Sequence, residues 1–150
     1  RSLAARGLSF DLQLIPELML PMAEVLSQVP DLHVALCHAG SPYDRTTEGI
    51  SKWAANLIHM SALPNVSCKL SGLGMFDHDW SAQSVRPIAE IVMDQFGPDR
   101  VMFGSNFPVC SLSSSFEELI ERHMAIVPVE HHAMVFHDTA ARFYFKHSNS

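Results

Sequence analysis

The chain has 150 residues, of which 47% are apolar and 17% charged, a composition typical of a folded globular domain that buries a core. Ten basic and sixteen acidic residues leave a formal net charge of −6, which argues against nucleic acid as a partner because proteins that bind it neutralise phosphates with clustered Lys and Arg. No apolar run approaches the roughly 18 residues that cross a membrane, and no secretory leader opens the chain, so we expect a cytoplasmic protein without membrane contact.

Short β-rich segments alternate with longer segments of helical period along the chain. Strands are predicted over residues 7–12, 32–37, 66–70 and 100–104. Helices are predicted over residues 22–29, 50–58, 85–96, 116–127 and 133–143. The first of these helices should begin near Met22 with Pro21 in its first turn, because proline disrupts a helix interior. This order of elements is that of four β/α units.

The spacing of the strands predicts a parallel sheet. Comparable points of the last three strands, His33, Val66 and Arg100, are about 33 residues apart, which accommodates a strand, a crossover helix and two loops. No glycine-rich phosphate loop follows any of the strands, so a nucleotide-binding sheet is disfavoured. A (β/α)8 barrel is the remaining arrangement of parallel strands and crossover helices that the pattern favours.

Polar residues of a single parity mark the strands. A barrel strand is buried on both faces, so such residues are expected only where they face a functional opening. In the first predicted strand they are Ser9, Asp11 and Gln13, in the third they are Ser67, Lys69 and Ser71, and the second and fourth strands end at His38 and Asn106. The four groups together predict a polar site at the carboxyl ends of the strands.

Five sequence blocks carry a resemblance to a known family. They are GLSFDLQ (7–13), HAGSP (38–42), PNVSCKLSGL (64–73), FGPDRVMFGSNFPV (96–109) and AARFY (140–144). In this order they resemble the C-terminal half of the amidohydrolase-like TIM-barrel hydrolases (amidohydrolase 2), the metal-dependent group that includes L-fuconolactonase and 2-pyrone-4,6-dicarboxylate lactonase. The resemblance implies that residues 1–150 form a single partial barrel domain with strands five to eight.

The resemblance also implies that half of the barrel is absent. The family's first strand carries an HxH pair, and no HxH occurs in this sequence. A whole barrel takes about 250 residues. Alone, this half should expose two edge strands and the apolar inside of the open barrel, so we expect it to associate with the missing half or to form a homo-oligomer.

The activity implied by the resemblance is hydrolysis of a small sugar-acid or dicarboxylate lactone by activated water at the barrel mouth. His38 is the first candidate for catalysis and for a metal ligand, with a purely structural role as the alternative. Asn106 stands where the wider superfamily has a catalytic Asp, and an amide cannot accept a proton at neutral pH, so Asp11 is the candidate base. Whether Zn²⁺ or a similar divalent metal takes part stays open.

Three further residues are candidates for binding the small-molecule substrate: Lys69, Gln13 and Arg45. The Lys69 ammonium could hold a substrate carboxylate or polarise a carbonyl, and its alternative role is an ion pair with Asp11. Hydrolysis is one of two functions that are compatible with the sequence. The other hypothesis is a non-catalytic barrel fragment that serves as a structural or interaction module.

Overall fold

Four parallel strands form the centre of the molecule in the computed structural model, which describes residues 1–145. The strands are β1 (Phe10–Leu12), β2 (Val34–Leu36), β3 (Val66–Leu70) and β4 (Val101–Phe103). They follow one another in the sheet in the order β1-β2-β3-β4, and each neighbouring pair is parallel. The parallel sheet predicted from the strand spacing is therefore confirmed.

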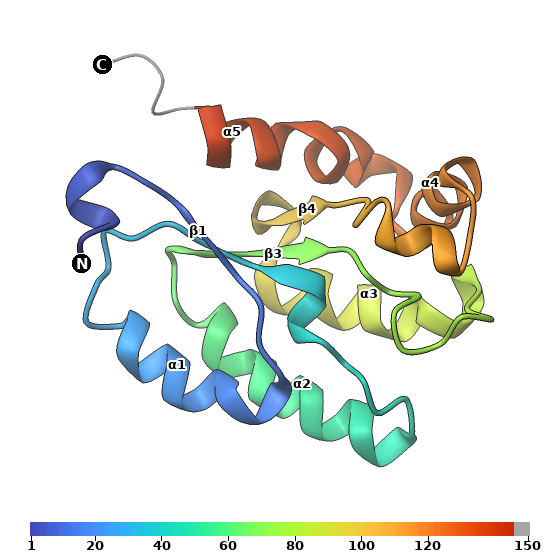
Figure 1. Cartoon of the computed structure of the whole chain (residues 1–150), viewed down its shortest axis with the longest axis horizontal. Helices are drawn as coiled ribbons and strands as arrows, with labels where there is room; N and C mark the ends of the chain where they lie inside the picture. The colour runs from blue at the N-terminus through green and yellow to red at the C-terminus, as the bar shows by residue number, and fades with distance from the viewer. Residues whose placement is uncertain (146–150) are drawn as a thin grey trace.

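Five α-helices accompany the strands within residues 1–145, joined by short 3-10 turns and a π-helical segment at Met134–Asp138 (Figure 1). They are α1 (Met19–Leu26), α2 (Thr47–Ser61), α3 (Ala82–Phe96), α4 (Phe116–Ile126) and α5 (Thr139–Phe145). Helix α1 begins at Met19 rather than near Met22, so Pro21 lies in its first turn, where proline costs no helical hydrogen bond. No helix in this part of the chain is long and apolar enough to cross a membrane.

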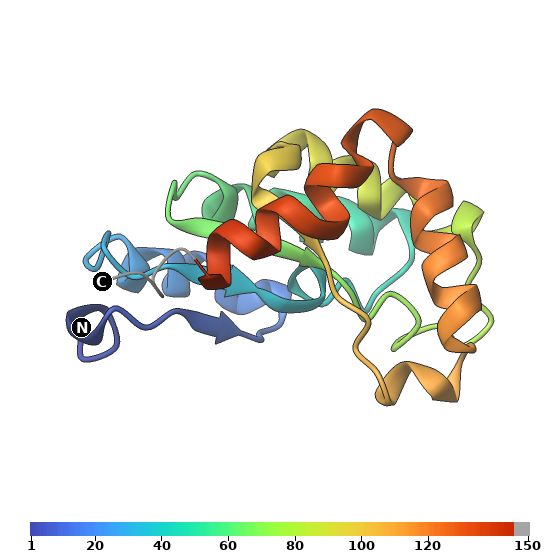
Figure 2. The ribbon, with the colours of Figure 1, turned by 90° about the horizontal axis from the view of Figure 1, so that it is seen from above.

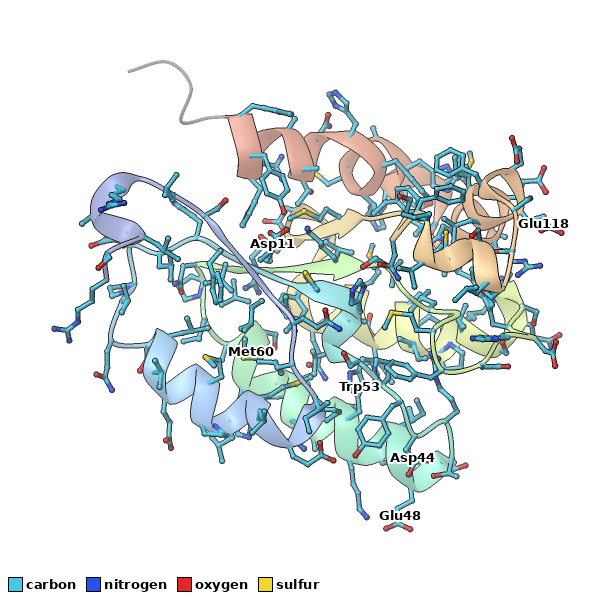
Figure 3. The ribbon with its side chains drawn as sticks, viewed as in Figure 1. Asp11, Asp44, Glu48, Trp53, Met60 and Glu118 are labelled. Atoms are coloured by element: carbon cyan, nitrogen blue, oxygen red, sulfur yellow. The ribbon has the colours of Figure 1, made fainter. Side chains whose placement is uncertain are left out.

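The main core lies between one face of the sheet and helices α1, α2 and α3. Side chains at alternate strand positions point to this face because successive residues of a strand project to opposite sides. They are Val34, Leu36, Val66, Cys68, Leu70 and Val101, all fully buried. Trp53 and Met60 meet them from α2 (Figure 3), and each fully buried side chain of this kind contributes about 1.5–3 kcal/mol to stability.

The opposite face of the sheet is covered by helix α5. Phe143 packs there against Ala35 and Met102, which are 0% and 1% exposed. Figure 1 shows α5 on the other side of the sheet from α1 and α2, and Figure 2 shows it crossing over the strands. The expectation that the apolar side chains of this face are exposed is therefore wrong for Ala35 and Met102, because the chain's own last helix buries them. The described chain is an open sheet with helices on both faces.

Candidate functional site

His38 lies directly after β2, in a strained left-handed segment. Its φ and ψ are 56° and 39°, and φ is also positive at Ala39 and Ser41. Residues with a Cβ pay roughly 1–2 kcal/mol each for this conformation, so the fold must hold the segment in place. Ser71 does so: its buried Oγ lies 3.0 Å from Nδ1 of His38 and accepts the backbone N–H of His38 at 3.2 Å.

The surroundings of His38 keep its imidazole neutral. Burial lowers its pKa, and the nearby positive charge of Lys69 lowers it further. A neutral imidazole can accept a proton or bind a metal. Ser71 was visible in the sequence as a polar residue of the right parity on the third strand, but its role in positioning His38 depends on a contact between strands that the pattern does not contain.

Asp11, Lys69 and Tyr144 form a polar cluster on the face covered by α5. Lys69 Nζ lies 2.6 Å from Asp11 Oδ2, and the Tyr144 hydroxyl donates to Asp11 Oδ1 at 2.6 Å. The Lys69 ammonium also lies 5.3 Å from the centre of the Tyr144 ring. Figure 3 shows Asp11 on the side of the sheet that faces α5. The ion pair expected as the alternative role of Lys69 is thus present, with Tyr144 as a third member.

The cluster keeps Lys69 charged and Tyr144 protonated. Burial alone would lower the pKa of Lys69, but the hydrogen bond to Asp11 and the proximity of Tyr144 outweigh it and the pKa is raised. Burial, followed by the hydrogen bond to Asp11, raises the pKa of Tyr144 to about 12. The Lys69 and Asp11 side chains are 20% and 47% exposed, so the pair remains within reach of a small molecule.

Asn106 lies apart from this cluster. It follows β4 with a φ of 52°, a conformation that Asn tolerates better than most residues. Its side chain borders a cavity of about 140 Å³ between the loops that follow β3 and β4. Its Nδ2 is buried without a hydrogen-bond partner in the described chain.

The other two predicted substrate ligands occupy different surroundings. Gln13 is exposed after β1 and borders a shallow hollow together with Tyr43 and Phe76. Arg45 donates from Nη2 to the carbonyl of Leu73 at 2.8 Å and so ties down the loop after β3. Burial lowers the pKa of Arg45. Lys69 interacts electrostatically with both His38 and Asp11, whereas the charge that acts on Arg45 within residues 1–145 is that of Asp77.

The described residues do not form a metal site of their own. No group of three or more His, Cys, Asp or Glu side chains in residues 1–145 is placed to hold a metal ion. His38 offers one nitrogen, and a catalytic zinc site needs three protein ligands. Further ligands would have to come from outside these residues.

The sequence is similar to known amidohydrolases. The sequence model of the amidohydrolase family matches residues 1–146. The uncharacterized protein y4mH of Sinorhizobium fredii is 39% identical over 147 residues, which cover 96% of this chain and 49% of that protein. An L-fucono-1,5-lactonase of Burkholderia multivorans is 40% identical over 124 residues, which cover 73% of this chain and 42% of the lactonase.

A solved structure shares the fold. A Burkholderia multivorans amidohydrolase, crystallised with bound Zn, superposes with a TM-score of 0.86 at 29% identity, covering 95% of this chain and 54% of its own. The chain therefore spans about half the length of the relatives that it matches.

Proposed function

The chain belongs to the amidohydrolase family, and we propose that it supplies one half of the active site of a lactonase that hydrolyses a small sugar-acid or dicarboxylate lactone. Hydrolysis of a lactone requires a base that takes a proton from water, a group that polarises the carbonyl, and a proton for the leaving ring oxygen. His38, Lys69 and Asp11 supply groups of these kinds on three adjacent strands or strand ends.

His38 is the residue that we assign as the base, and the imidazolium that forms when it takes a proton from water then gives this proton to the leaving ring oxygen. The single observation that carries this is the position of the imidazole, whose Nδ1 lies 3.0 Å from Ser71 Oγ while Nε2 makes no hydrogen bond in residues 1–145; burial, which lowers the pKa of His38, favours the form that accepts a proton. Asn106 cannot act as a base. Asp11 is a weaker candidate because one of its oxygens is bonded to Lys69 and the other to Tyr144.

We assign Lys69 the role of binding the substrate's negative charge or polarising its carbonyl oxygen. An ammonium with a raised pKa stays charged at neutral pH and stabilises the oxyanion that develops when water attacks. Asp11 then orients the ammonium. A role of His38 as a metal ligand would need ligands from outside the described residues, so no step is assigned to a metal.

We also propose that the remaining half of a barrel pairs with the sheet. Strands β1 and β4 are the two edges of the sheet, and Phe10 on β1 is 37% exposed. Unpaired edge strands with apolar side chains favour pairing with further strands. The N-terminal part of a related lactonase is the natural source of those strands.

The test combines this chain with the part of the Burkholderia multivorans lactonase that it does not match. Assembly is followed by size-exclusion chromatography, and hydrolysis of L-fucono-1,5-lactone is followed by proton release, with and without a chelator. We expect the combination to hydrolyse the lactone, His38→Ala to abolish hydrolysis, and His137→Ala, a change at a side chain 79% exposed, to leave it unchanged. An assembled complex that is inactive on all lactones offered refutes the proposal.

A further inference from the structure

A small, partly open cavity lies near His38, separate from the cluster of Asp11, Lys69 and Tyr144. Its volume is about 140 Å³, close to the ~150 Å³ at which an engineered apolar cavity in another protein binds benzene. Its walls are mostly apolar side chains from the loops after β3 and β4 and from α4: Leu73, Met75, Val109 and Leu119.

Two hydrogen-bond donors on this wall have no partner. Trp80 is 2% exposed and borders the cavity, and its indole Nε1 is buried without a hydrogen bond in the described chain. Nδ2 of Asn106, on the same wall, is likewise buried without a hydrogen bond in the described chain. Buried N–H groups are almost always paired, so two unpaired donors on one cavity indicate an acceptor that the chain itself does not provide.

Gly74 lets its backbone pack closely against the indole. A Cβ at Gly74 would lie 2.4 Å from Nε1 of Trp80 and 2.5 Å from Oγ of Ser113. The backbone of Gly74 is not in the left-handed region, so its conformation does not require glycine. The lack of a side chain therefore matters for this close approach, because a Cβ at Gly74 would displace Trp80 or Ser113.

We propose that this cavity binds a small uncharged group, a ring or a short alkyl chain, that carries an acceptor oxygen. The oxygen accepts hydrogen bonds from the N–H groups of Trp80 and Asn106, and the carbon atoms of the ligand contact the apolar wall. No Lys, Arg, Asp or Glu of the described residues lines the cavity, and the one histidine on its wall, His78, is exposed, so a charged ligand would lose its hydration without gaining a fixed, buried counter-charge.

The cavity adjoins the proposed base. Gly72 borders it, and a Cβ at Gly72 would lie 2.6 Å from Nδ1 of His38. A lactone attacked next to His38 can therefore place an uncharged, oxygen-bearing part of its ring or substituent in the cavity. This assignment of substrate class rests on the proposed lactonase function, whereas binding in the cavity does not.

The binding test uses cyclopentanone, a ring with one acceptor oxygen that cannot be hydrolysed, and the indole N–H signals of the chain in two-dimensional NMR. The two tryptophans provide an internal control, because the indole of Trp53 already donates to the carbonyl of Ala39 at 2.7 Å in the core. We expect cyclopentanone, added to about 50 mM, to move the Trp80 signal and to leave the Trp53 signal in place. Acetate at the same ionic strength should move neither.

Two variants locate the site. Gly74→Ala should weaken the response at least ~10-fold by displacing the indole of Trp80 from its place on the cavity wall, and the Trp53 signal reports whether the core remains folded. Asn106→Asp keeps the shape and the tolerance for positive φ but replaces an N–H donor with a carboxylate, and it should weaken the response as well. A Trp80 signal unmoved by cyclopentanone, or moved equally by acetate, or moved equally in Gly74→Ala, overturns the proposal. Because the ketone is not a substrate, these results are independent of whether the lactonase assay succeeds.

Discussion

Replacement of His123 by Phe should reduce the loss of free energy of unfolding that occurs when the pH falls. His123 lies in the part of the fold that borders the cavity. His123, on α4, is 0% exposed, with Nδ1 donating to the carbonyl of Leu119 at 2.8 Å and Nε2 buried without a partner in residues 1–145. Its ring packs edge-on against Trp80 and Phe103, with ring centres 5.7 Å and 5.0 Å away. Burial, partly offset by the bond to Leu119, lowers its pKa to about 4.

The sign and size of the effect follow from the two pKa values. The ordinary pKa of 6.5 applies to the unfolded chain, so the unfolded state takes up a proton first as the pH falls. The stability due to neutral His123 is present above pH 6.5 and is lost as the pH falls from 6.5 toward 4. Between pH 7 and pH 5 the loss amounts to about 2 kcal/mol in the free energy of unfolding.

Urea unfolding followed by circular dichroism at pH 7 and pH 5 measures this loss directly. The wild-type chain should lose about 2 kcal/mol more than His123→Phe between the two pH values. His137→Gln, at an exposed histidine, is the matched control and should follow the wild type. If His123→Phe and the wild type lose the same free energy between pH 7 and pH 5, burial of a neutral His123 does not limit acid stability and the reasoning fails.

Three further substitutions test the site and its support. Tyr144→Phe should lower the free energy of unfolding by about 1 kcal/mol in thermal or urea unfolding, since it removes a hydrogen bond to a half-exposed carboxylate; no change would mean that α5 does not hold Asp11. Gly72→Ala should abolish hydrolysis in the combined lactonase assay, because its φ is +63° and its Cβ would displace the imidazole of His38; full activity would contradict that contact. Arg100→Met should lower the free energy of unfolding by about 2–4 kcal/mol in urea, because the guanidinium donates to four backbone carbonyls. Arg100→Lys should retain only part of this stability. A loss below ~1 kcal/mol in Arg100→Met would show that water replaces those hydrogen bonds.

The elements of the fold were largely predictable because their signals are local. The third strand was predicted over the residues that form β3, and α3 ends at Phe96, the predicted last residue, with Gly97 as its cap and Pro98 after it, a pair that commonly ends helices. Two overlapping Ser-x-x-Glu patterns open α4, Ser114 with Glu117 and Ser115 with Glu118, and the capping box forms at the second. The last helix was predicted as one segment, yet it contains a π-helical stretch, a departure that helical spacing does not reveal.

The candidate site was predictable only in part, because its geometry depends on contacts between distant segments. Alternation of polar and apolar residues assigned Asp11 and Lys69 to one face. The register of the strands brings Lys69 Nζ to 2.6 Å from Asp11 Oδ2, where the two form an ion pair. The positive φ of Asn106 turns its side chain toward the cavity with Trp80, and no local pattern in the sequence predicts that turn.

The position of α5 shows most clearly where sequence reasoning ends. Phe136, Ala140 and Phe143 recur at helical spacing and predict one apolar face, but two apolar surfaces could receive it. Phe136 packs near Phe103 in the main core, whereas Phe143 lies across the sheet against Ala35 and Met102. Burial of both surfaces by one segment removes more apolar area from water than a helix confined to either side, and this choice is decided only when all the strands are in place. The same packing brings Tyr144 to Asp11, so the helix that completes the core also sets the hydrogen bonding of the proposed site.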